Sequence, residues 1–345
     1  MAETQGRIMT GLIRIAPHRG DHRVALRAAF SLAVPLLVLW ALGRLDLSVY
    51  ASFGAFASLY GRFDPYADRI RMQAAAGVTL LSCMMLGTLV SFAGLPDAAR
   101  VGIVAVIAAI VTLIAHVWRW HPPGGLFAVF AAGACASLPA TAGSFLVVLV
   151  VGGASAAFGV AVSTVIALAR GGWRIAPPRG TRHPAAATGV VARGVDVALT
   201  VAIGAALAGL AGLFLIGNHW YWAMVAAVAA LGGAELNARV IRGVQRLLGT
   251  VLGIAVAAGL LALHLPPLVT VLVAVLLQAG AELYVSRNYG ITMLFVTPLA
   301  LLMVELAVPA DPVVLLRDRM LDTVIGVAVG TLVAVASALL RRRRA

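Results

Sequence analysis

Long apolar runs, separated by short polar gaps, fill most of the chain. A helix needs about 20 apolar residues to cross the hydrocarbon layer of a membrane, and shorter runs suffice where protein rather than lipid surrounds them. We therefore predict an all-α integral membrane protein with about twelve spans, the second, eighth and tenth being the shortest. The predicted spans are residues 24–43, 47–60, 72–93, 101–117, 124–140, 144–169, 195–217, 219–232, 247–264, 267–281, 289–307 and 320–340.

The spans fall into two sets of six with similar sequences. Gln73-x-x-x-Gly77 recurs 172 residues later as Gln245-x-x-x-Gly249. Because six is an even number, both sets run in the same direction through the membrane, so we predict two parallel six-helix repeats related by an axis along the membrane normal. The predicted domains are an amino-terminal segment (1–23), a first repeat (24–169), a linker rich in Arg, Pro and Gly (170–193), a second repeat (194–340) and a basic tail (341–345).

Composition and arginine placement support a membrane protein and orient it. Hydrophobic residues make up 62% of the chain and charged residues 11%, and the mean hydropathy is +1.00. These values exclude a soluble globular enzyme and a disordered chain. With the amino terminus inside, 22 of the 26 basic residues fall on the cytoplasmic side, in agreement with the positive-inside rule. We therefore predict a multi-pass protein of the cell membrane with both termini in the cytoplasm and a retained first span.

The placement of charge also decides the expected partners. The net charge of +13 lies in short gaps between apolar runs rather than on a water-soluble face, so nucleic acid is not an expected partner. We expect membrane lipid and a small anionic organic solute instead, and we leave open a homo-oligomer.

Several kinds of chemistry are excluded by residue types that the sequence lacks or scatters. All 26 basic residues are Arg, so the sequence has neither a phosphate-binding G-x-x-x-x-G-K-[ST] loop nor a Schiff-base lysine. Cys83 and Cys135 lie within apolar runs, and the seven His are dispersed without zinc-like spacing. We therefore expect no enzyme activity, no cofactor and no metal, and any uphill transport would use an ion gradient.

The second and eighth predicted spans are both short and occupy the same place in each repeat. Paired short segments of this kind point to the substrate site of a transporter. His219, Trp220 and Trp222 open the eighth span, and Tyr50 takes the place of Trp222 in the first repeat. These rings suit the wall of a binding site for a planar substrate; an aromatic belt at the membrane surface is the alternative.

Three arginines precede the ninth predicted span. Arg242 and Arg246 share one helix face because they lie four residues apart, and Arg239 lies near that face. Guanidinium groups fit carboxylates, so the row predicts a binding site for carboxylate-bearing solutes at the inner mouth. Anchoring to anionic lipid is the alternative.

Carboxylates within membrane spans are costly and therefore functional by default. Glu305 and Asp322 lie near the outer ends of the last two predicted spans, beside Arg319. We predict these three residues as candidates for proton coupling. A structural ion pair between Asp322 and Arg319, three residues earlier on the same helix, is the alternative.

Three motifs together carry a family resemblance. His219-Trp220-Tyr221-Trp222-Ala and Arg242-Gly-Val-Gln-Arg246-Leu-Leu-Gly249-Thr-Val-Leu-Gly253 resemble the core of the fusaric-acid-resistance-like membrane family, and Arg319-x-x-Asp322-Thr-x-x-Gly326 is similar to its closing helix. The resemblance covers roughly the second half of the chain. It implies efflux of aromatic carboxylic acids and a distant likeness to plant malate channels. Exporters of this type usually carry a large soluble domain between membrane blocks, which the short linker here replaces, so the substrate does not carry over.

We therefore predict a secondary or passive transporter, or efflux protein, for small organic acids of the aromatic carboxylic kind. One alternative is a generic twelve-span facilitator, to whose second-to-third-span loop Asp68-Arg69-Ile-Arg71 is weakly similar. The other is a structural membrane protein of the cell envelope without transport.

Overall fold

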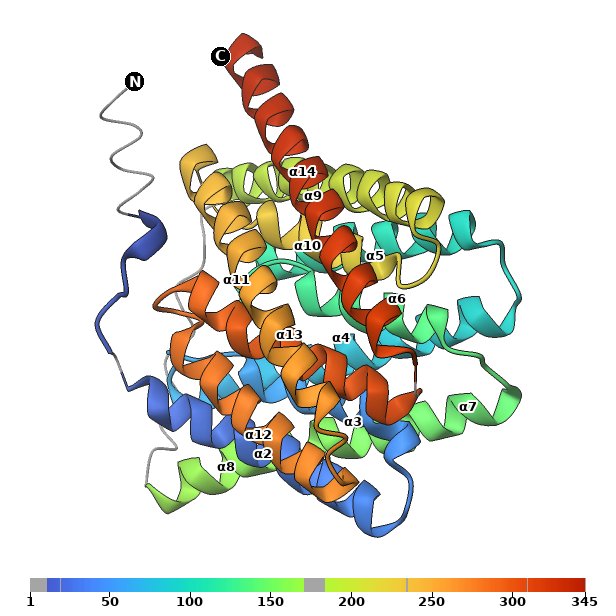
Figure 1. Ribbon diagram of the computed structural model, residues 1–345. Coiled ribbons are helices and arrows are strands. Elements are labelled where there is room, and N and C mark those ends of the chain that lie inside the picture. The colour runs from blue at the N-terminus through green and yellow to red at the C-terminus, as the bar shows by residue number, and fades with distance from the viewer. Residues whose placement is uncertain (1–10, 19, 171–183, 234, 309, 345) are drawn as a thin grey trace. The chain divides into compact units, whose positions relative to one another are not determined.

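The computed structural model describes residues 11–18, 20–170, 184–233, 235–308 and 310–344 (Figure 1). In this part of the chain every regular element is a helix and no strand occurs, which confirms the predicted all-α class. The elements up to residue 170 are α2 (Asp21–Ala41), η1 (Leu45–Leu47), α3 (Ser48–Ala55), η2 (Phe56–Leu59), α4 (Tyr66–Phe92), α5 (Asp97–Val117), α6 (Leu126–Ser137), α7 (Ala142–Val147), η3 (Val148–Gly152) and α8 (Gly153–Ala169). The later ones are α9 (Pro184–Leu215), α10 (Tyr221–Ala230), α11 (Leu236–Ala262), α12 (Pro267–Tyr284), α13 (Tyr289–Ala307) and α14 (Pro312–Arg344).

Nine helices of the described residues are long and apolar enough to cross a membrane. They are α2, α4, α5, the continuous run from α7 to α8, α9 and α11 to α14. The protein is therefore a multi-pass membrane protein. Three shorter apolar helices, Leu45–Leu59, Leu126–Ser137 and Tyr221–Ala230, accompany them. The total of twelve spans stays a prediction.

The short helices differ in part from the expected ones. The second and eighth predicted spans are indeed short, but the tenth is wrong in length: α12 has 18 residues and continues to Tyr284. The fifth was expected over residues 124–140, yet α6 has only 12 residues. It ends at Ser137 because Leu138, in extended conformation, precedes Pro139, and a residue before proline disfavours the helical region.

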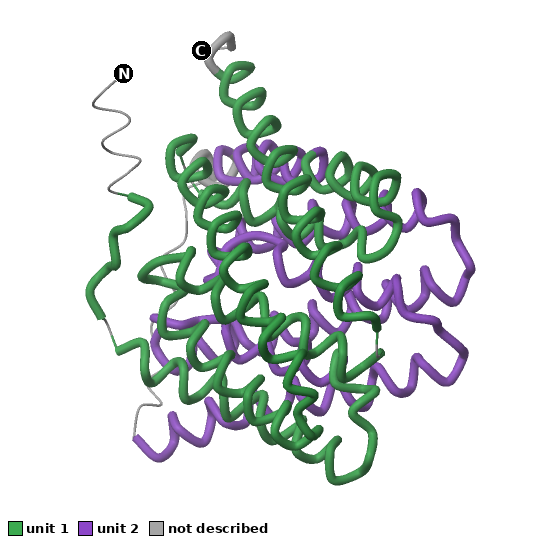
Figure 2. Tube along the Cα trace, in the orientation of Figure 1, with its two compact units in different colours: residues 1–49, 204–345 green, residues 50–203 purple. Residues whose placement is uncertain are grey.

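The chain divides into two compact units (Figure 2). Unit 1 comprises Met1–Val49 and Gly204–Ala345, and unit 2 comprises Tyr50–Ile203. At the first helix of each predicted repeat this division differs from the repeat boundaries: α2 of the first repeat packs on α12 within unit 1, and the first part of α9 belongs to unit 2. Compactness is a different property from sequence duplication, so the predicted repeat boundaries stay predictions. Residues 171–183 of the predicted linker lie outside the described residues, and α9 begins before the linker's predicted end.

Within unit 1, glycines allow the helices to approach closely. A side chain at Gly249 of α11 would meet the carbonyl of Gly290 on α13, and one at Gly326 of α14 would meet the carbonyl of Ala223 on α10. Ala223 also packs with Ala208 of α9 in a buried cluster. As a result α10 is buried along its whole length. A helix surrounded by protein need not span the lipid, which explains why ten residues suffice.

Unit 2 uses the same kind of contact around α8. A side chain at Gly54 of α3 would meet the carbonyl of Gly152, just before α8, and α4 packs against α6 and α8. The Gln73 amide on α4 donates to the carbonyls of Ser58 and Tyr60, at 2.9 and 3.1 Å, and so fixes the turn after η2. Tyr50 is buried in α3.

Candidate functional site

Trp222 lies fully buried in α10. Its ring is contacted by a histidine, His219, and by an arginine, Arg319. The His219 ring stacks on it, with centroids 4.5 Å apart and planes 12° apart. The guanidinium carbon of Arg319 on α14 lies 5.2 Å from the ring centroid. Trp220, also buried, packs edge-on against Tyr221. The aromatic residues of this turn therefore lie inside unit 1 rather than forming a belt that faces lipid.

His219 is held in place by a carboxylate from α14. Its backbone is left-handed (φ 56°), and its Nδ1 lies 3.2 Å from Oδ2 of Asp318. The other oxygen of Asp318 accepts from Nη2 of Arg317 at 2.9 Å. His219 lies in the turn before α10, where burial lowers its pKa although the nearby Asp318 opposes this. A neutral His219 is thus favoured beside Trp222.

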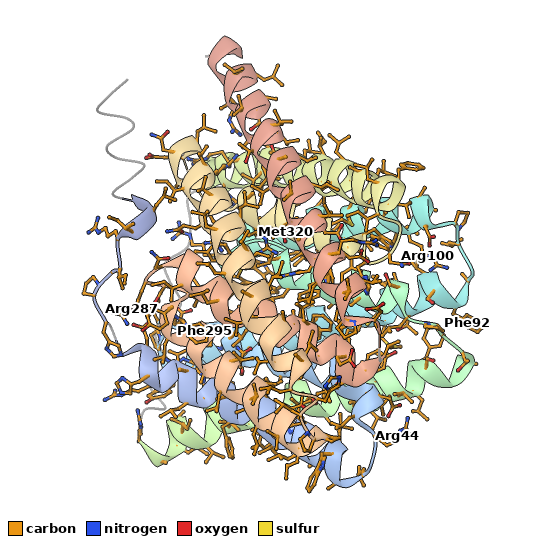
Figure 3. All side chains as sticks on the ribbon, in the orientation of Figure 1. Arg44, Phe92, Arg100, Arg287, Phe295 and Met320 are labelled. Carbon is orange, nitrogen blue, oxygen red and sulfur yellow. The ribbon has the colours of Figure 1, made fainter. Side chains whose placement is uncertain are left out.

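Arg319 and Asp322 are buried on α14 without pairing to each other. Arg319 is 1% exposed and Asp322 is 0% exposed. Nε and Nη1 of Arg319 and both carboxylate oxygens of Asp322 have no hydrogen-bond partner among the described residues. Arg319 and Asp322 therefore do not form the structural ion pair that was the alternative. The Arg319 guanidinium lies over the ring of Trp222 instead. Met320, labelled in Figure 3, marks this stretch of α14.

The three arginines of α11 have three different surroundings. Arg239 donates to the carbonyl of Gly233 at 3.0 Å and secures the turn after α10. Arg242 donates to the carbonyl of Ala229 at 3.1 Å. Arg246 is 2% exposed and points into unit 1. The predicted row thus separates into two arginines that bind backbone and one that lies among the polar side chains of the interior.

Tyr289, at the start of α13, joins the arginines of α11 to this interior. Nη1 of Arg246 donates to its hydroxyl at 2.7 Å, and the guanidinium carbon of Arg242 lies 3.8 Å from its ring centroid. Nε of Arg246 has no hydrogen-bond partner in the part of the chain that the structure describes. Sequence reasoning missed Tyr289, because a tyrosine at the start of an apolar run is equally typical of the membrane surface and carries no signal of a partner on another helix.

These side chains form one group, which we call the buried polar cluster. Arg246, Tyr289 and Asp322 all lie within electrostatic range of Arg319, and Trp222 contacts it directly. The cluster thus comprises Trp222, Arg246, Tyr289, Arg319 and Asp322. The cluster holds two guanidinium groups and one carboxylate, and Nε of Arg246 and Nε and Nη1 of Arg319 have no acceptor among the described residues. Such an arrangement favours an additional anion.

Six of the ten predicted site residues are not members of the buried polar cluster: His219, Trp220, Arg239 and Arg242, whose contacts are given above, and Glu305 and Tyr50. Glu305 lies at the end of α13, where its Oε2 accepts from the backbone N–H of Ala310 at 3.3 Å. Tyr50 belongs to unit 2. The assignment of any of these residues to substrate binding or proton coupling stays a prediction. No group of His, Cys, Asp or Glu side chains in the described ranges is suited to hold a metal ion.

An amino-terminal segment, residues 11–18, lies against α11 at Gln245 and against the start of α13 at Asn288. Nε2 of Gln245 donates to the carbonyls of Gly11 and Leu12, at 3.3 and 3.2 Å. Nδ2 of Asn288 donates to the carbonyls of Leu12 and Arg14, at 3.0 and 3.2 Å. Sequence analysis had treated this stretch only as a polar cytoplasmic segment.

Comparison with known proteins bears on the half of the chain that holds this cluster. Residues 203–333 match a family model described as fusaric acid resistance protein-like. The matched range contains all members of the buried polar cluster. No curated protein and no solved structure matches the chain.

Proposed function

We propose that this protein, which by residues 203–333 belongs to the fusaric acid resistance protein-like family, transports small organic acids, above all aromatic carboxylates, across the membrane. Family membership and the multi-pass helices support transport. The observation that carries the anionic substrate is the pair of buried guanidinium groups, Arg246 and Arg319: Nε of Arg246 and Nε and Nη1 of Arg319 have no acceptor among the described residues. The family match favours this function over a generic facilitator.

Charge balance supports an anionic ligand at the buried polar cluster. An ion removed from water costs several kcal/mol even after the protein relaxes. Arg246 and Arg319 are both nearly unexposed, and Asp322 balances only one of them. A carboxylate that enters the cluster would bring the second negative charge. It would also accept from N–H groups that have no partner in the described residues.

The ring of Trp222 supports an aromatic substrate. It lies directly beside the Arg319 guanidinium, so a carboxylate bound to Arg319 would place an attached ring near a flat apolar surface. Offset or edge-on ring pairs contribute about 0.5–1.5 kcal/mol beyond burial. The aliphatic acids lack that contribution, so we propose that they bind less tightly.

Orientation and coupling complete the proposal. We propose the cell membrane as the location, both termini in the cytoplasm by the positive-inside rule, lipid as the surrounding partner, and two parallel six-helix repeats. Of the carboxylate candidates, Asp322 is better placed than Glu305 for proton coupling, because Glu305 is already bonded to the loop backbone. The energy source would be an ion gradient.

The test is efflux of radiolabelled benzoate from proteoliposomes that contain the full chain. We expect Arg246→Gln and Arg319→Gln each to lower the flux at least about tenfold, because a hydrogen bond to a charged group contributes about 1.5–3 kcal/mol. The matched control is Arg44→Gln, since Arg44 pairs with Asp46 in an exposed loop of the same unit. Flux no greater than that of empty liposomes would contradict transport. Equal flux in all three variants would contradict the role of the cluster.

A further inference from the structure

The contacts of residues 11–18, here called the strap, go beyond what a tethered tail requires. The Gln245 and Asn288 amides that hold the strap are buried, at 9% and 6% exposure. A third contact adds two bonds: Nε of Arg287 donates to the carbonyl of Ala16 at 2.9 Å, and the N–H of Ala16 donates to the carbonyl of Arg287 at 3.1 Å. The strap thus satisfies buried donors that would otherwise lose their acceptors.

The position of these contacts is specific. Gln245 directly precedes Arg246, and Asn288 directly precedes Tyr289. Both anchors therefore adjoin members of the buried polar cluster, on two different helices, α11 and α13. The strap joins the two helices between which Arg246 donates to Tyr289. It also packs tightly on α11, because a side chain at Gly11 would meet Cδ1 of Ile241 at 2.7 Å.

Five of the six bonds join neutral groups, and the sixth, from Nε of Arg287 to the carbonyl of Ala16, is charge-assisted. Every acceptor on the strap is a backbone carbonyl, and the anchors Gln245 and Asn288 are neutral amides. Neutral hydrogen bonds contribute modestly to stability, so the detached state stays within reach of thermal opening. The detached strap can bind the membrane surface. Ile13 and Ile15 are exposed, at 79% and 48%, and Arg14 lies between them, so the strap combines apolar and basic side chains as surface-binding segments do.

We propose that residues 11–18 form a gate, which closes the end of unit 1 beside Arg246 and Tyr289 and opens by leaving Gln245 and Asn288. In the closed state the strap separates the aqueous phase from the buried polar cluster at this end. In the open state the cluster is accessible. The gate does not depend on which solute is transported, and access can be measured without any substrate.

The experiment measures the access of a water-soluble thiol reagent to Thr250→Cys in the full chain. Thr250 is unexposed and lies one turn beyond Arg246 on α11. The native Cys83 and Cys135 are buried in unit 2 and give the background rate. The strap is released by Gln245→Glu combined with Asn288→Asp. Both changes keep the size of the side chain and replace the donating amide with an oxygen that repels the strap carbonyls, and Asp at 288 keeps the acceptor that caps α13.

The matched control is Gln73→Glu, the same substitution at the corresponding position of the first repeat, where the amide holds a turn instead of the strap. We expect the released variant to react at least about tenfold faster at residue 250 than Thr250→Cys alone, and the control to react at the unchanged rate. Trypsin cleavage after Arg14 reports release directly and should accelerate in parallel. Release without faster labelling would overturn the gate, and so would unchanged cleavage at Arg14.

A second variant keeps the gate testable if the released protein folds poorly. Gly11→Cys with Ile241→Cys places two thiols where the strap meets α11, and their disulfide locks the strap down. We expect benzoate flux to fall at least about tenfold on oxidation and to recover on reduction. This measurement rests on the proposed function, whereas the labelling of residue 250 does not. If no benzoate flux is found but labelling of residue 250 still depends on release of the strap, the proposed substrate is contradicted and the gate is not. If benzoate flux is the same with the disulfide oxidised and reduced, the gate is contradicted.

Discussion

The guanidinium carbon of Arg319 lies 5.2 Å from the centroid of the Trp222 ring. A cation over a desolvated indole ring is stabilised by about 2 kcal/mol or more. This contact takes the place of an ion pair with Asp322, so that Arg319 keeps Nε and Nη1 without acceptors. Trp222 therefore links the packing of α10 to the charge state of the interior of unit 1.

Truncation of Trp222 should be costly for stability. Because the side chain is fully buried, we expect Trp222→Ala to lower the free energy of unfolding by about 3–5 kcal/mol. Trp222→Phe should cost less, since an aromatic face remains for Arg319. Denaturant unfolding in detergent measures both. Trp118→Ala is the control, because Trp118 is 62% exposed; a loss as large as that of Trp222→Ala would contradict the assigned role.

The close approach of α10 and α14 predicts a contrast between two glycines. A side chain at Gly326 would meet the carbonyl of Ala223 and the side chain of Ala226, whereas nothing lies within 4 Å of the corresponding point at Gly259 on α11. We expect Gly326→Ala to destabilise the protein by about 1–3 kcal/mol. Gly259→Ala should be neutral or stabilising, because Ala favours helix. Melting temperatures of the two variants, measured side by side, decide the matter; equal values would argue against the observed packing.

Burial of His219 predicts a stability that depends on pH. Its pKa is lowered in the folded state by burial, despite Asp318, while the unfolded chain retains a value of about 6.5. As the pH falls through about 6.5, the unfolded state takes up the proton first, so stability is full above that pH and declines below it. Melting temperatures between about pH 5 and 7.5 should show this decline, and His219→Gln should reduce it. An identical slope in both proteins would be incompatible with this account.

Proton coupling predicts different effects of two neutralised carboxylates. Asp322→Asn removes the charge of a buried carboxylate without partners, so we expect it to abolish flux that a pH gradient drives. Glu305→Gln keeps an oxygen for the N–H of Ala310 and should leave that flux unchanged. Benzoate uptake into proteoliposomes with an imposed pH gradient distinguishes the two. The reverse ranking would assign the coupling to Glu305.

Several features of the candidate site could be anticipated from sequence because they depend on residue type and spacing. Arg319 and Asp322 stand out as charged residues in an apolar run, and burial of such groups is costly enough to demand a role. The short helix after His219 could be predicted because the apolar run there is too short to cross the lipid by itself. Tyr289 and Gln245 were not assigned to the site, because nothing in a linear pattern says that the start of α13 lies beside the stretch of α11 around Arg246.

Other outcomes depended on competition between contacts. Spacing makes Arg319 and Asp322 candidates for an ion pair, yet the guanidinium lies over Trp222, because tertiary packing brings α10 against α14. Likewise, Arg239, Arg242 and Arg246 share a helix face in sequence but bind three different partners. Helical spacing says which side chains can meet along one helix, and it says nothing about what a neighbouring helix offers.

Composition and the lengths of apolar runs alone determined the all-helical, multi-pass nature of the protein, because backbone groups in lipid must be satisfied within each helix. Motif spacing alone pointed to the family that residues 203–333 match. Only the tertiary structure decided that α2 packs on α12 and that residues 11–18 bond to Gln245 of α11 and to Asn288 at the start of α13. It also decided which charged groups stay without partners, because such contacts join residues hundreds of positions apart and leave no periodic trace in the chain.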